Sequence, residues 1–501
     1  MSLSSPRVDL AWVLVALVMV GAMPLLTGLY QYLLVIVHFL RLHYDRCQPW
    51  LPRTAILIPA WNEAAVIEAS IDRLMSLDYP REALRIYVVD DASTDETPQV
   101  IQAKAEDYPG SVVHLRRETG GEGKAAALNH GLIQILGDDW MQALLIMDAD
   151  VIYERDSLRA MSRHLADPKV GAVTGYIQEG SRPGNYMTRF IAYEYITAQA
   201  AARRAQNVIG ALACLAGGAQ LHSRANVEAI GGQIDTGTLA EDTVTTFRTQ
   251  LDQRRVLFEP HAKIWAEEPG SISALWKQRL RWARGNVQVT WLFRRVWFRP
   301  RRTHRLGSVS FGAIWFSVFL LPVTLLLASA ALVTLYFIDY GLSHTAFHAL
   351  WIINVIAYVF ITAYSLLIDP QTGRRTWRQG ILFPGVISLT IMAGVVLTDP
   401  VQWLVRHAVI AIGLPYGGWV VHAVVLFTYA WLSASVLVAY LAKVVERDSG
   451  PRKYLSVVLL YLAGYGALLC AITLAAYVKE IRGAESTWDK TEKTGKMSVP
   501  I

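Results

Sequence analysis

The sequence predicts an α/β domain with a mostly parallel sheet, inserted between α-helical transmembrane segments. Hydrophobic residues make up 53% of the 501 residues, only 18% are charged, and the mean hydropathy is +0.30. This composition is typical of a membrane protein and excludes intrinsic disorder. Long stretches without Asp, Glu, Lys or Arg cover residues 10–40, 306–338, 340–368, 379–398, 407–442 and 454–478. Because a helix crosses a bilayer with about 20 apolar residues, we expect about six spans, one before the α/β domain and five after it.

The distribution of charge divides the chain into five parts. Between Arg41 and Arg305, charged residues recur every few positions and short apolar runs alternate with amphipathic ones, as in an α/β domain. We therefore expect a transmembrane anchor, an α/β domain, amphipathic interfacial helices, a bundle of transmembrane helices and a polar tail, at residues 1–45, 46–270, 271–305, 306–480 and 481–501. Pro24 leaves open a bent pair of helices in the anchor. Residues 407–414 could form an interfacial helix before the next span.

Basic residues indicate on which side of the membrane the α/β domain lies. Arg41, Arg46 and Arg53 flank its start, and a larger set flanks its end: Arg294, Arg295, Arg299, Arg301, Arg302 and Arg305. If the spans alternate, two later loops lie on the same side, one with Arg374, Arg375 and Arg378 and the other with Lys443, Arg447, Arg452 and Lys453. Short cytoplasmic loops are rich in Lys and Arg, so the domain and these loops are predicted to be cytoplasmic. The net charge of +6 fits this arrangement better than nucleic-acid binding.

The cysteine content excludes a small secreted fold held by disulfides. The three cysteines are Cys47, Cys214 and Cys470, and their spacing is typical of neither disulfide pairs nor metal ligands. We interpret all three as packing residues.

Strands and helices alternate in the first half of the predicted α/β domain. Expected strands lie at residues 55–59, 85–89, 111–115 and 143–147, and helical patterns follow at 64–77, after Asp95, at 129–136 and, further on, at 243–250. A glycine-rich turn, residues 120–124, precedes the third helix. Such alternation is typical of a parallel sheet, in which ligands bind at the carboxyl ends of the strands.

Acidic residues follow two of these strands. Asp90 and Asp91 end the second strand, and Asp148 and Asp150 follow the strand at 143–147. Two carboxylates spaced by one residue can bind a hard divalent cation, which in turn can bridge the phosphates of a nucleotide. Taken alone, each pair is as easily a solvated turn. Lys124 can likewise contact the phosphate or the base of a nucleotide, or be an ordinary surface lysine.

Two further motifs lie nearer the end of the domain. Glu241 and Asp242 precede a helical pattern, where they can act as an N-terminal cap or as a general base. Gln278, Arg281 and Trp282 follow with i, i+3 and i+4 spacing, which places them on one face of a helix. Arg and Trp on such a helix are also typical of one that lies at a membrane surface.

Together and in this order, the motifs resemble the processive family 2 membrane glycosyltransferases, which include cellulose, chitin, hyaluronan and poly-N-acetylglucosamine synthases. The matching elements are Pro59-Ala-Trp-Asn-Glu63, Asp90-Asp-Ala-Ser93, Lys124-Ala-Ala-Ala-Leu-Asn129, Asp148-Ala-Asp150, Glu241-Asp242 and Gln278-Arg-Leu-Arg-Trp282. The last is the most specific, because it marks the processive branch. The resemblance covers residues 53–305 and implies a GT-A fold. Residues 169–232 resemble poly-N-acetylglucosamine and hyaluronan synthases more than cellulose synthases.

The resemblance also implies roles for individual residues. Ala60, Glu63, Asp91 and Lys124 would contact the uridine of a UDP-sugar, with Asp90 beside them. Asp148 and Asp150 would hold the diphosphate through Mg²⁺ or Mn²⁺. Glu241 and Asp242 would be the catalytic carboxylates, with Asp242 the general base. Gln278 and Arg281 would hold the leaving diphosphate, and Trp282 would stack on the acceptor sugar.

The resulting prediction is an enzyme of the bacterial inner membrane that adds sugar, most readily from UDP-N-acetylglucosamine, to a growing β-linked exopolysaccharide and secretes it through its membrane helices. The expected partners are the UDP-sugar, the polysaccharide, membrane lipids and a small accessory membrane subunit, and no nucleic acid. Three alternatives remain open: a β-glucan synthase that uses UDP-glucose, transfer of a single sugar to a lipid carrier, and a transporter that only senses nucleotide sugar.

Overall fold

A computed structural model describes residues 6–41, 47–446, 452–485 and 497, which form two compact units. The sheet unit comprises Leu33–Gly270, Arg284–Gly312 and Gly483–Ile501, and the helical unit comprises Met1–Tyr32, Ser271–Ala283 and Ala313–Arg482. The expected cytoplasmic residues Arg46 and Arg447, and most of the expected polar tail, lie outside the described residues.

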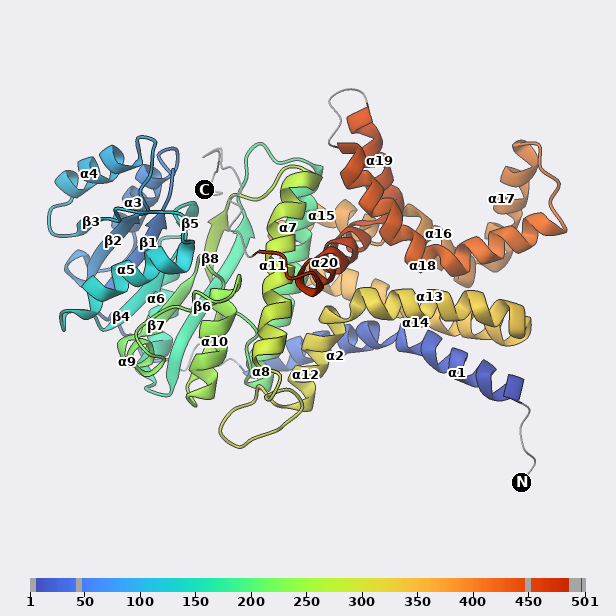
Figure 1. The fold of residues 1–501 in the computed structure, drawn as a ribbon, viewed down its shortest axis with the longest axis horizontal. Helices are drawn as coiled ribbons and strands as arrows, with labels where there is room; N and C mark the ends of the chain where they lie inside the picture. Colours follow the sequence, from blue (N-terminus) through green and yellow to red (C-terminus); the bar gives the residue numbers. More distant parts are fainter. Residues whose placement is uncertain (1–5, 42–46, 447–451, 486–496, 498–501) are drawn as a thin grey trace. The chain divides into compact units, whose positions relative to one another are not determined.

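An eight-stranded sheet organises the sheet unit, with the order β3-β2-β1-β4-β7-β6-β8-β5 (Figure 1). Its strands are β1 (Thr54–Ala60), β2 (Leu84–Asp90), β3 (Val112–Arg116), β4 (Ala143–Ile146), β5 (Val151–Tyr153), β6 (Val170–Glu179), β7 (Gln220–Ser223) and β8 (Arg255–Ala266). The first four strands are parallel to one another. β7 is antiparallel to β4 and β6, β8 is parallel to β6, and β5 is antiparallel to β8. The sheet is thus parallel in its first half and mixed in its second.

Helices cover the sheet and give it a continuous hydrophobic core. They are α3 (Ile67–Met75), η2 (Arg81–Ala83), α4 (Thr97–Asp107), α5 (Lys124–Leu136), α6 (Ser157–Ser162), η3 (Arg163–Ala166), α7 (Tyr186–Tyr195), η4 (Ile196–Ala201), α8 (Ala202–Ile209), α9 (Arg224–Ala229) and α10 (Glu241–Leu251). α5 packs on β1 and β2, where its Leu128 and Leu132 meet Leu57 and Val89. β1 is buried on both faces, which explains its continuous apolar sequence.

A close approach between α5 and the sheet depends on a glycine. A Cβ added at Gly131 would lie 2.4 Å from Leu57 Cδ1 and 2.9 Å from Val89 Cγ2. Any side chain at this position would push α5 away from β1 and β2. The helix would then carry Lys124, at its first residue, out of place.

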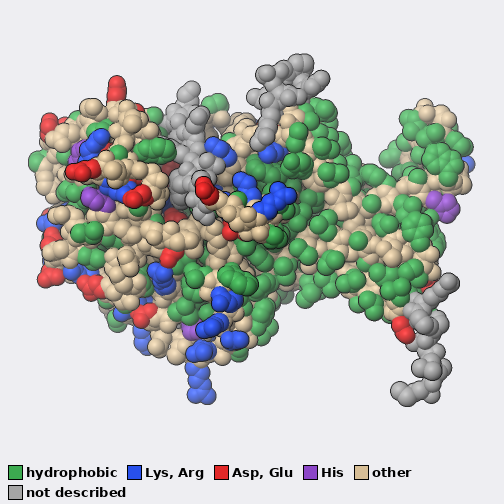
Figure 2. Space-filling view, in the orientation of Figure 1, with side chains coloured by type: hydrophobic (Ala, Val, Ile, Leu, Met, Phe, Trp, Pro, Cys, Tyr) green, Lys and Arg blue, Asp and Glu red, His purple; other side chains and the backbone are tan. Residues whose placement is uncertain are grey.

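The helical unit contains the apolar helices that the sequence predicts and further helices that are polar or amphipathic. They are α1 (Pro6–Val20), α13 (Leu321–Ile338), α14 (Tyr340–Ile368), α15 (Pro370–Leu382), α16 (Val386–Val396), α17 (Thr398–Ala411), α18 (Trp419–Glu446), α19 (Arg452–Ala463) and α20 (Tyr465–Ile481). The boundary between the units falls within α2 (Met23–Arg41), α11 (Ile272–Leu292) and α12 (Val309–Phe319). Hydrophobic side chains dominate the visible surface of this unit (Figure 2).

Within the described residues, four helical stretches are long and apolar enough to cross a membrane: Val8–Arg41, Leu321–Ile338, Tyr340–Ile368 and Trp419–Glu446. Two helix pairs that are bent by 74° and 96°, α15 with α16 and α19 with α20, raise the number to six if each pair is one span. The anchor has a short break before Pro24, because α1 ends at Val20 and α2 begins at Met23, but Val8–Arg41 still counts as one candidate span and is not one of the bent pairs. A helix also covers the first part of the expected segment 407–414, but it begins earlier, at Thr398, and ends at Ala411.

One expected loop is wrong. Residues 369–379, which carry Arg374, Arg375 and Arg378, form most of α15 instead of a loop. The Asp369 side chain accepts a hydrogen bond of 3.0 Å from the Thr372 backbone N–H, and Pro370 occupies the first turn. An N-cap aspartate followed by proline strongly favours the start of a helix. The distribution of charges, from which the loop was predicted, does not take this signal into account.

Candidate active site

The carboxyl ends of β1 and β2 hold the first acidic pair. Asp90 is fully buried, and the Asp91 backbone N–H donates a 2.8 Å hydrogen bond to the Ala60 carbonyl. Asp90 accepts hydrogen bonds from Arg116 at 2.5 Å and from the Ser93 backbone N–H at 2.9 Å. Asp90 therefore holds the turn after β2 in place. Its neighbour Asp91 is contacted by the loop that follows β3.

Asp91 is held by the loop that follows β3. Arg117 forms short ion pairs with both Asp91 and Glu122. The Gly121 backbone N–H lies 3.5 Å from the second carboxylate oxygen of Asp91. Gly120 allows this approach, because a Cβ there would lie 2.3 Å from the Asp91 carbonyl oxygen. Arg117 is a site residue that sequence reasoning missed, and its position one residue beyond β3 is the signal that could have indicated it.

The loop after β1 is bound to the loop after β2. The Asn62 and Glu63 backbone N–H groups donate to the hydroxyls of Ser93 and Thr97, at 2.9 and 2.8 Å. Asn62 returns a contact through its side-chain oxygen, which accepts from the Thr94 backbone N–H at 2.8 Å. The structure thus brings Ala60, Glu63, Asp90 and Asp91 together at one edge of the sheet.

A second group of charged residues forms the Lys124 cluster, which we define as Lys124, Asp148, Glu241 and Asp242. The Lys124 ammonium lies 2.5 Å from Asp148 Oδ1 and 3.7 Å from Glu241 Oε1, and it donates to the Gly217 carbonyl at 3.1 Å. Lys124 begins α5, Asp148 follows β4, and Glu241 and Asp242 begin α10. Three separate segments of the chain therefore meet at this point, and the loop at Gly217 is a fourth.

The electrostatics of Lys124 reflect this position. Burial would lower the pKa of the ammonium, but Asp148, Glu241 and Asp242 outweigh burial and raise the pKa above its ordinary value. Lys124 is consequently charged at any physiological pH. A buried cation of this kind holds together carboxylates that would otherwise repel one another.

Two glycines lie against the carboxylates of the cluster. A Cβ added at Gly217 would lie 3.3 Å from both Asp242 Oδ2 and Lys124 Nζ, and one at Gly218 would lie 3.2 Å from Asp148 Oδ2. The Gly218 carbonyl also accepts a 2.9 Å hydrogen bond from Tyr153. Gly217, Gly218 and Tyr153 are further residues that sequence reasoning did not assign to the site. The small-residue run at 215–219 is a signal for the two glycines but not for Tyr153.

Asp242 has further neighbours on the other side. Burial lowers the pKa of Arg203, against the opposing influence of Cys214 and Asp242. Burial also raises the pKa of the Cys214 thiol, and Asp242 raises it further. One Asp242 oxygen accepts a hydrogen bond of 2.6 Å from the Thr243 backbone N–H. Asp242 thus lies between a cation, a neutral thiol and the start of its own helix.

The residues around Asp148 fit a divalent cation. The Asp148 side chain is 38% exposed, and glycine at position 218 leaves room beside its second oxygen. Asp150, two residues further along, is 9% exposed. No group of three or more His, Cys, Asp or Glu in the described part of the chain is arranged as a complete metal site. Two carboxylates suffice for Mg²⁺ when substrate phosphates supply further ligands, so Asp148 and Asp150 remain suitable.

Gln278, Arg281 and Trp282 belong to the part of α11 that lies in the helical unit. Arg279 organises this turn: it donates a 2.6 Å hydrogen bond to Gln278 Oε1, and its guanidinium lies 4.0 Å from the centroid of the Trp282 ring. Trp282 keeps 37% of its surface exposed. An exposed indole held by a stacked arginine is a surface to which a sugar ring could bind.

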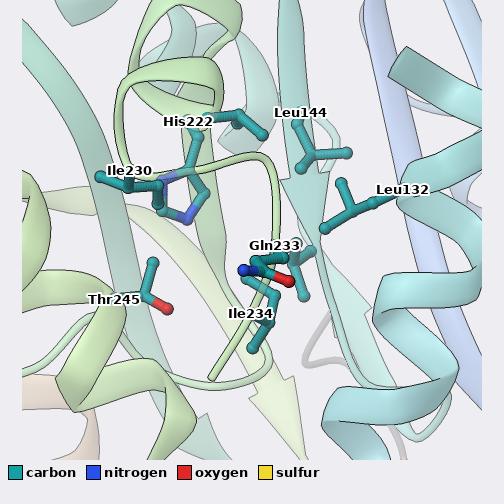
Figure 3. Close-up of a pocket in the computed structure, with 9 residues that line it drawn as sticks. Leu132, Leu144, His222, Ile230, Gln233, Ile234 and Thr245 are labelled. Carbon is teal, nitrogen blue, oxygen red and sulfur yellow. The ribbon is translucent and has the colours of Figure 1, made fainter. Parts of the chain in front are cut away.

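A pocket elsewhere in the sheet unit does not belong to the site. Its lining includes Leu132, Leu144, His222 and Ile234, which come from α5, β4, β7 and the chain after α9 (Figure 3). None of the predicted site residues lines it. It is a small apolar hollow between α5 and the sheet, next to the hydrophobic core.

A mixed sheet with acidic residues at the carboxyl ends of its strands defines a GT-A type enzyme domain. The model of the glycosyltransferase like family 2 matches residues 52–285 of the chain. The probable glycosyltransferase YdaM of Bacillus subtilis is 31% identical over 323 residues, which are 64% of this chain and 75% of that protein. The chain therefore belongs to glycosyltransferase family 2, and it is a glycosyltransferase.

Other relatives match a shorter part. The β-monoglucosyldiacylglycerol synthase of Synechocystis is 32% identical over 237 residues, 47% of this chain and 48% of that protein. The poly-β-1,6-N-acetyl-D-glucosamine synthase of Staphylococcus aureus is 30% identical over 234 residues, 46% and 54% of the two chains. The chain thus spans about half the length of these two relatives. Among solved structures, a mannosyltransferase from Pyrobaculum calidifontis in complex with GDP-Man and Mn²⁺ is 24% identical with a TM-score of 0.49, over 70% of this chain and 98% of that one.

Proposed function

We propose that the protein transfers sugar processively from a UDP-sugar, with UDP-N-acetylglucosamine the first candidate, to a growing β-linked exopolysaccharide that leaves through the membrane. The observation that carries the proposal is the Lys124 cluster, in which Asp242 lies beside Lys124 and Asp148 at the end of the sheet. A catalytic base and a phosphate-binding carboxylate are the two groups that this transfer needs in one place.

Asp242 is the proposed base. One of its oxygens accepts from the Thr243 backbone N–H, and the other faces Gly217, where no side chain intervenes. In the proposed reaction Asp242 takes the proton from the acceptor hydroxyl, whose oxygen forms the new bond as the bond to the UDP leaving group breaks. A single displacement inverts the anomeric carbon, so an α-linked donor gives a β-linked product. Glu241 contacts the same ammonium and would hold Lys124 in position.

The donor would bind along the carboxyl edge of the sheet. Ala60, Glu63 and Asp91 are the proposed uridine contacts, and Arg117 positions Asp91 for this role. Asp148 and Asp150 would hold Mg²⁺ or Mn²⁺, which when bound offsets the charge of the diphosphate.

The processive part of the proposal depends on the helical unit. Gln278 and Arg281 would hold the leaving diphosphate, and Trp282 would stack on the acceptor sugar. Up to six candidate spans offer a route for the polymer. The similarity to a poly-β-1,6-N-acetyl-D-glucosamine synthase supports this polymer class. We further propose that the protein lies in a bacterial inner membrane, with the sheet unit cytoplasmic.

A second candidate function is the transfer of one sugar to a lipid. The similarity to a β-monoglucosyldiacylglycerol synthase favours it specifically. The same chemistry at Asp242 would serve, and the two candidates differ in whether the product is extended.

The first experiment is UDP release from detergent-purified protein with Mg²⁺ or Mn²⁺. UDP-N-acetylglucosamine, UDP-glucose and UDP-glucuronate are supplied singly and in pairs, with and without diacylglycerol, and the products are sized. We expect release from UDP-N-acetylglucosamine alone and a long product. A product of one sugar on diacylglycerol would replace the proposal by its alternative, and release only from UDP-glucose would indicate a β-glucan.

Asp242→Asn gives a sharper test of the chemistry. An asparagine keeps the oxygen that accepts from Thr243 but cannot take a proton. We expect turnover to fall by about 100-fold or more while UDP affinity stays within a factor of about two, since positioned proton transfer supplies about 10²–10⁴ in rate. Near wild-type turnover would exclude Asp242 as the base.

A further inference from the structure

A second group of titratable side chains lies in the sheet unit, apart from the residues proposed for glycosyl transfer. Cys47 precedes β1, His164 lies in η3, and Glu259 lies in β8. Cys47 Sγ is 3.1 Å from His164 Nδ1, and His164 Nε2 is 2.6 Å from Glu259 Oε2. The three side chains form a hydrogen-bonded chain from a thiol to a carboxylate.

Glu259 is ionised in this chain. It is fully buried, and it accepts hydrogen bonds from Arg163 at 2.9 Å and from the backbone and ring nitrogens of His261 at 2.9 and 2.8 Å. Burial would raise the pKa of Glu259, but the hydrogen bonds from His164, His261 and Arg163 outweigh burial and lower the pKa below its usual range. A carboxylate with these donors is an acceptor only.

The charge state of Glu259 fixes the tautomer of His164. Because the carboxylate only accepts, Nε2 of His164 carries the hydrogen, and in the neutral ring Nδ1 is then an acceptor. The Cys47 thiol is the donor that lies on it. Burial would lower the pKa of His164, but Cys47 and Glu259 outweigh burial and raise it, so the ring is well suited to accept the thiol proton.

We propose that Cys47 is a nucleophilic thiol activated by His164, and that it is a site of covalent modification by small electrophiles, hydroperoxides above all. A nucleophile, a base bonded to it and a buried group that orients the base is the arrangement that activates cysteine in enzymes. Cys47 is partly exposed, whereas His164 is only 2% exposed. A reagent can therefore approach Cys47 from solvent, while the base beside it stays buried.

The proposed step with a hydroperoxide balances as follows. The Cys47 proton moves to His164 Nδ1, the sulfur attacks the terminal peroxide oxygen, and the O–O bond breaks as the S–O bond forms. The leaving alkoxide or hydroxide takes the proton back from Nδ1. The thiol is oxidised to a sulfenic acid, and the peroxide is reduced to an alcohol or water.

The test uses the full chain in detergent with Cys214→Ser and Cys470→Ser, so that Cys47 is the only thiol. Intact-protein mass spectrometry measures the rate of iodoacetamide alkylation and of oxidation by hydrogen peroxide trapped with dimedone. We expect His164→Asn to slow both reactions by about 100-fold, the lower end of what positioned proton transfer supplies. His261→Asn is the matched control, because it removes a donor to Glu259 but leaves the pair of Cys47 and His164 intact; its rates should change by less than about threefold.

A comparison that needs no further variant covers the case in which His164→Asn does not fold. The rates for the folded protein are compared with those of the same chain in urea at the same pH, where Cys47 has no neighbours. Folded protein that reacts at least about tenfold faster supports the proposal. Equal or slower reaction in the folded state overturns it and makes the hydrogen-bonded chain a structural tether between the segment before β1 and the sheet.

Discussion

Lys124 is the residue whose removal tests the organisation of the cluster most directly. Lys124→Met keeps the length of the side chain but removes the ammonium that lies 2.5 Å from Asp148 and 3.7 Å from Glu241. Breaking a buried ion pair by removing one partner costs about 3–5 kcal/mol. Water reaches the Asp148 side chain, which is 38% exposed, whereas Glu241 is 7% exposed and bears most of the cost. We therefore expect a loss of about 2–3 kcal/mol in the free energy of unfolding of the sheet unit.

The assay is thermal unfolding in detergent at pH 7 without divalent cation. The folded-state pKa of Lys124 lies above its ordinary value, so its contribution is fully present at this pH and is lost only as the pH rises through the folded-state pKa. A loss of this size lowers the unfolding midpoint by roughly 3–5 °C for a domain of this length. Lys169→Met, which replaces an exposed lysine of the same unit, should change it by less than about 2 °C.

Divalent cation then separates the electrostatic effect from a packing defect. Mg²⁺ bound at Asp148 would replace part of the lost positive charge, so millimolar Mg²⁺ should raise the midpoint of Lys124→Met more than that of the wild type. An unchanged midpoint in metal-free buffer would refute the view that Lys124 holds the carboxylates together. A lowered midpoint that Mg²⁺ does not restore would refute the binding of cation at this carboxylate.

Two further predictions concern the sheet unit. Arg117→Ala should weaken UDP binding by about tenfold, because a charge-assisted hydrogen bond to Asp91 is lost. Calorimetry measures this affinity. Arg159→Ala is the control, because it removes only an exposed ion pair with Asp78 and should leave UDP affinity unchanged. Burial lowers the pKa of His222 from 6.5 to about 4. Between these pH values the ring is protonated in the unfolded chain but neutral in the folded chain. The free energy of unfolding should therefore fall by about 3 kcal/mol between pH 6.5 and pH 4. His222→Gln should flatten that part of the curve relative to the wild type, and an unchanged slope would mean that the ring is not held neutral.

The first half of the sheet could be predicted from the sequence because its strands are continuous apolar runs. β1, β2, β3 and β4 lie within one or two residues of their predicted positions. The second half could not. β5 has three residues, β7 reads Gln-Leu-His-Ser, and β8 is interrupted by an irregular register next to Pro260. These strands are specified by their partners in the sheet, and local sequence carries little of that information.

The candidate site was predictable as a set of residue types but not as a set of contacts. The acidic residues at the strand ends follow from the parallel topology, as Asp91 and Asp148 illustrate. The ion pair between Lys124 and Asp148 joins positions 24 residues apart, and the approach of Gly217 requires a strand, β7, that the sequence does not reveal. In the helical unit, Arg279 stacks on Trp282 and donates a hydrogen bond to Gln278. It lies between Gln278 and Arg281 in the sequence but is not one of the residues that define the motif.

The charges around Lys124 bear on how a donor can enter the site. Asp148, Glu241 and Asp242 act on Lys124, and Arg203 adds a second cation near Asp242, so three carboxylates face two cations. A nucleotide diphosphate would add two further negative charges to a region that is already negative and largely buried, where repulsion is weakly screened. Under the proposed function, a divalent cation held by Asp148 and Asp150 would supply the positive charge that a bound diphosphate needs. Donor affinity in the proposed reaction should therefore depend on divalent cation, because without one the carboxylates and the diphosphate would repel each other.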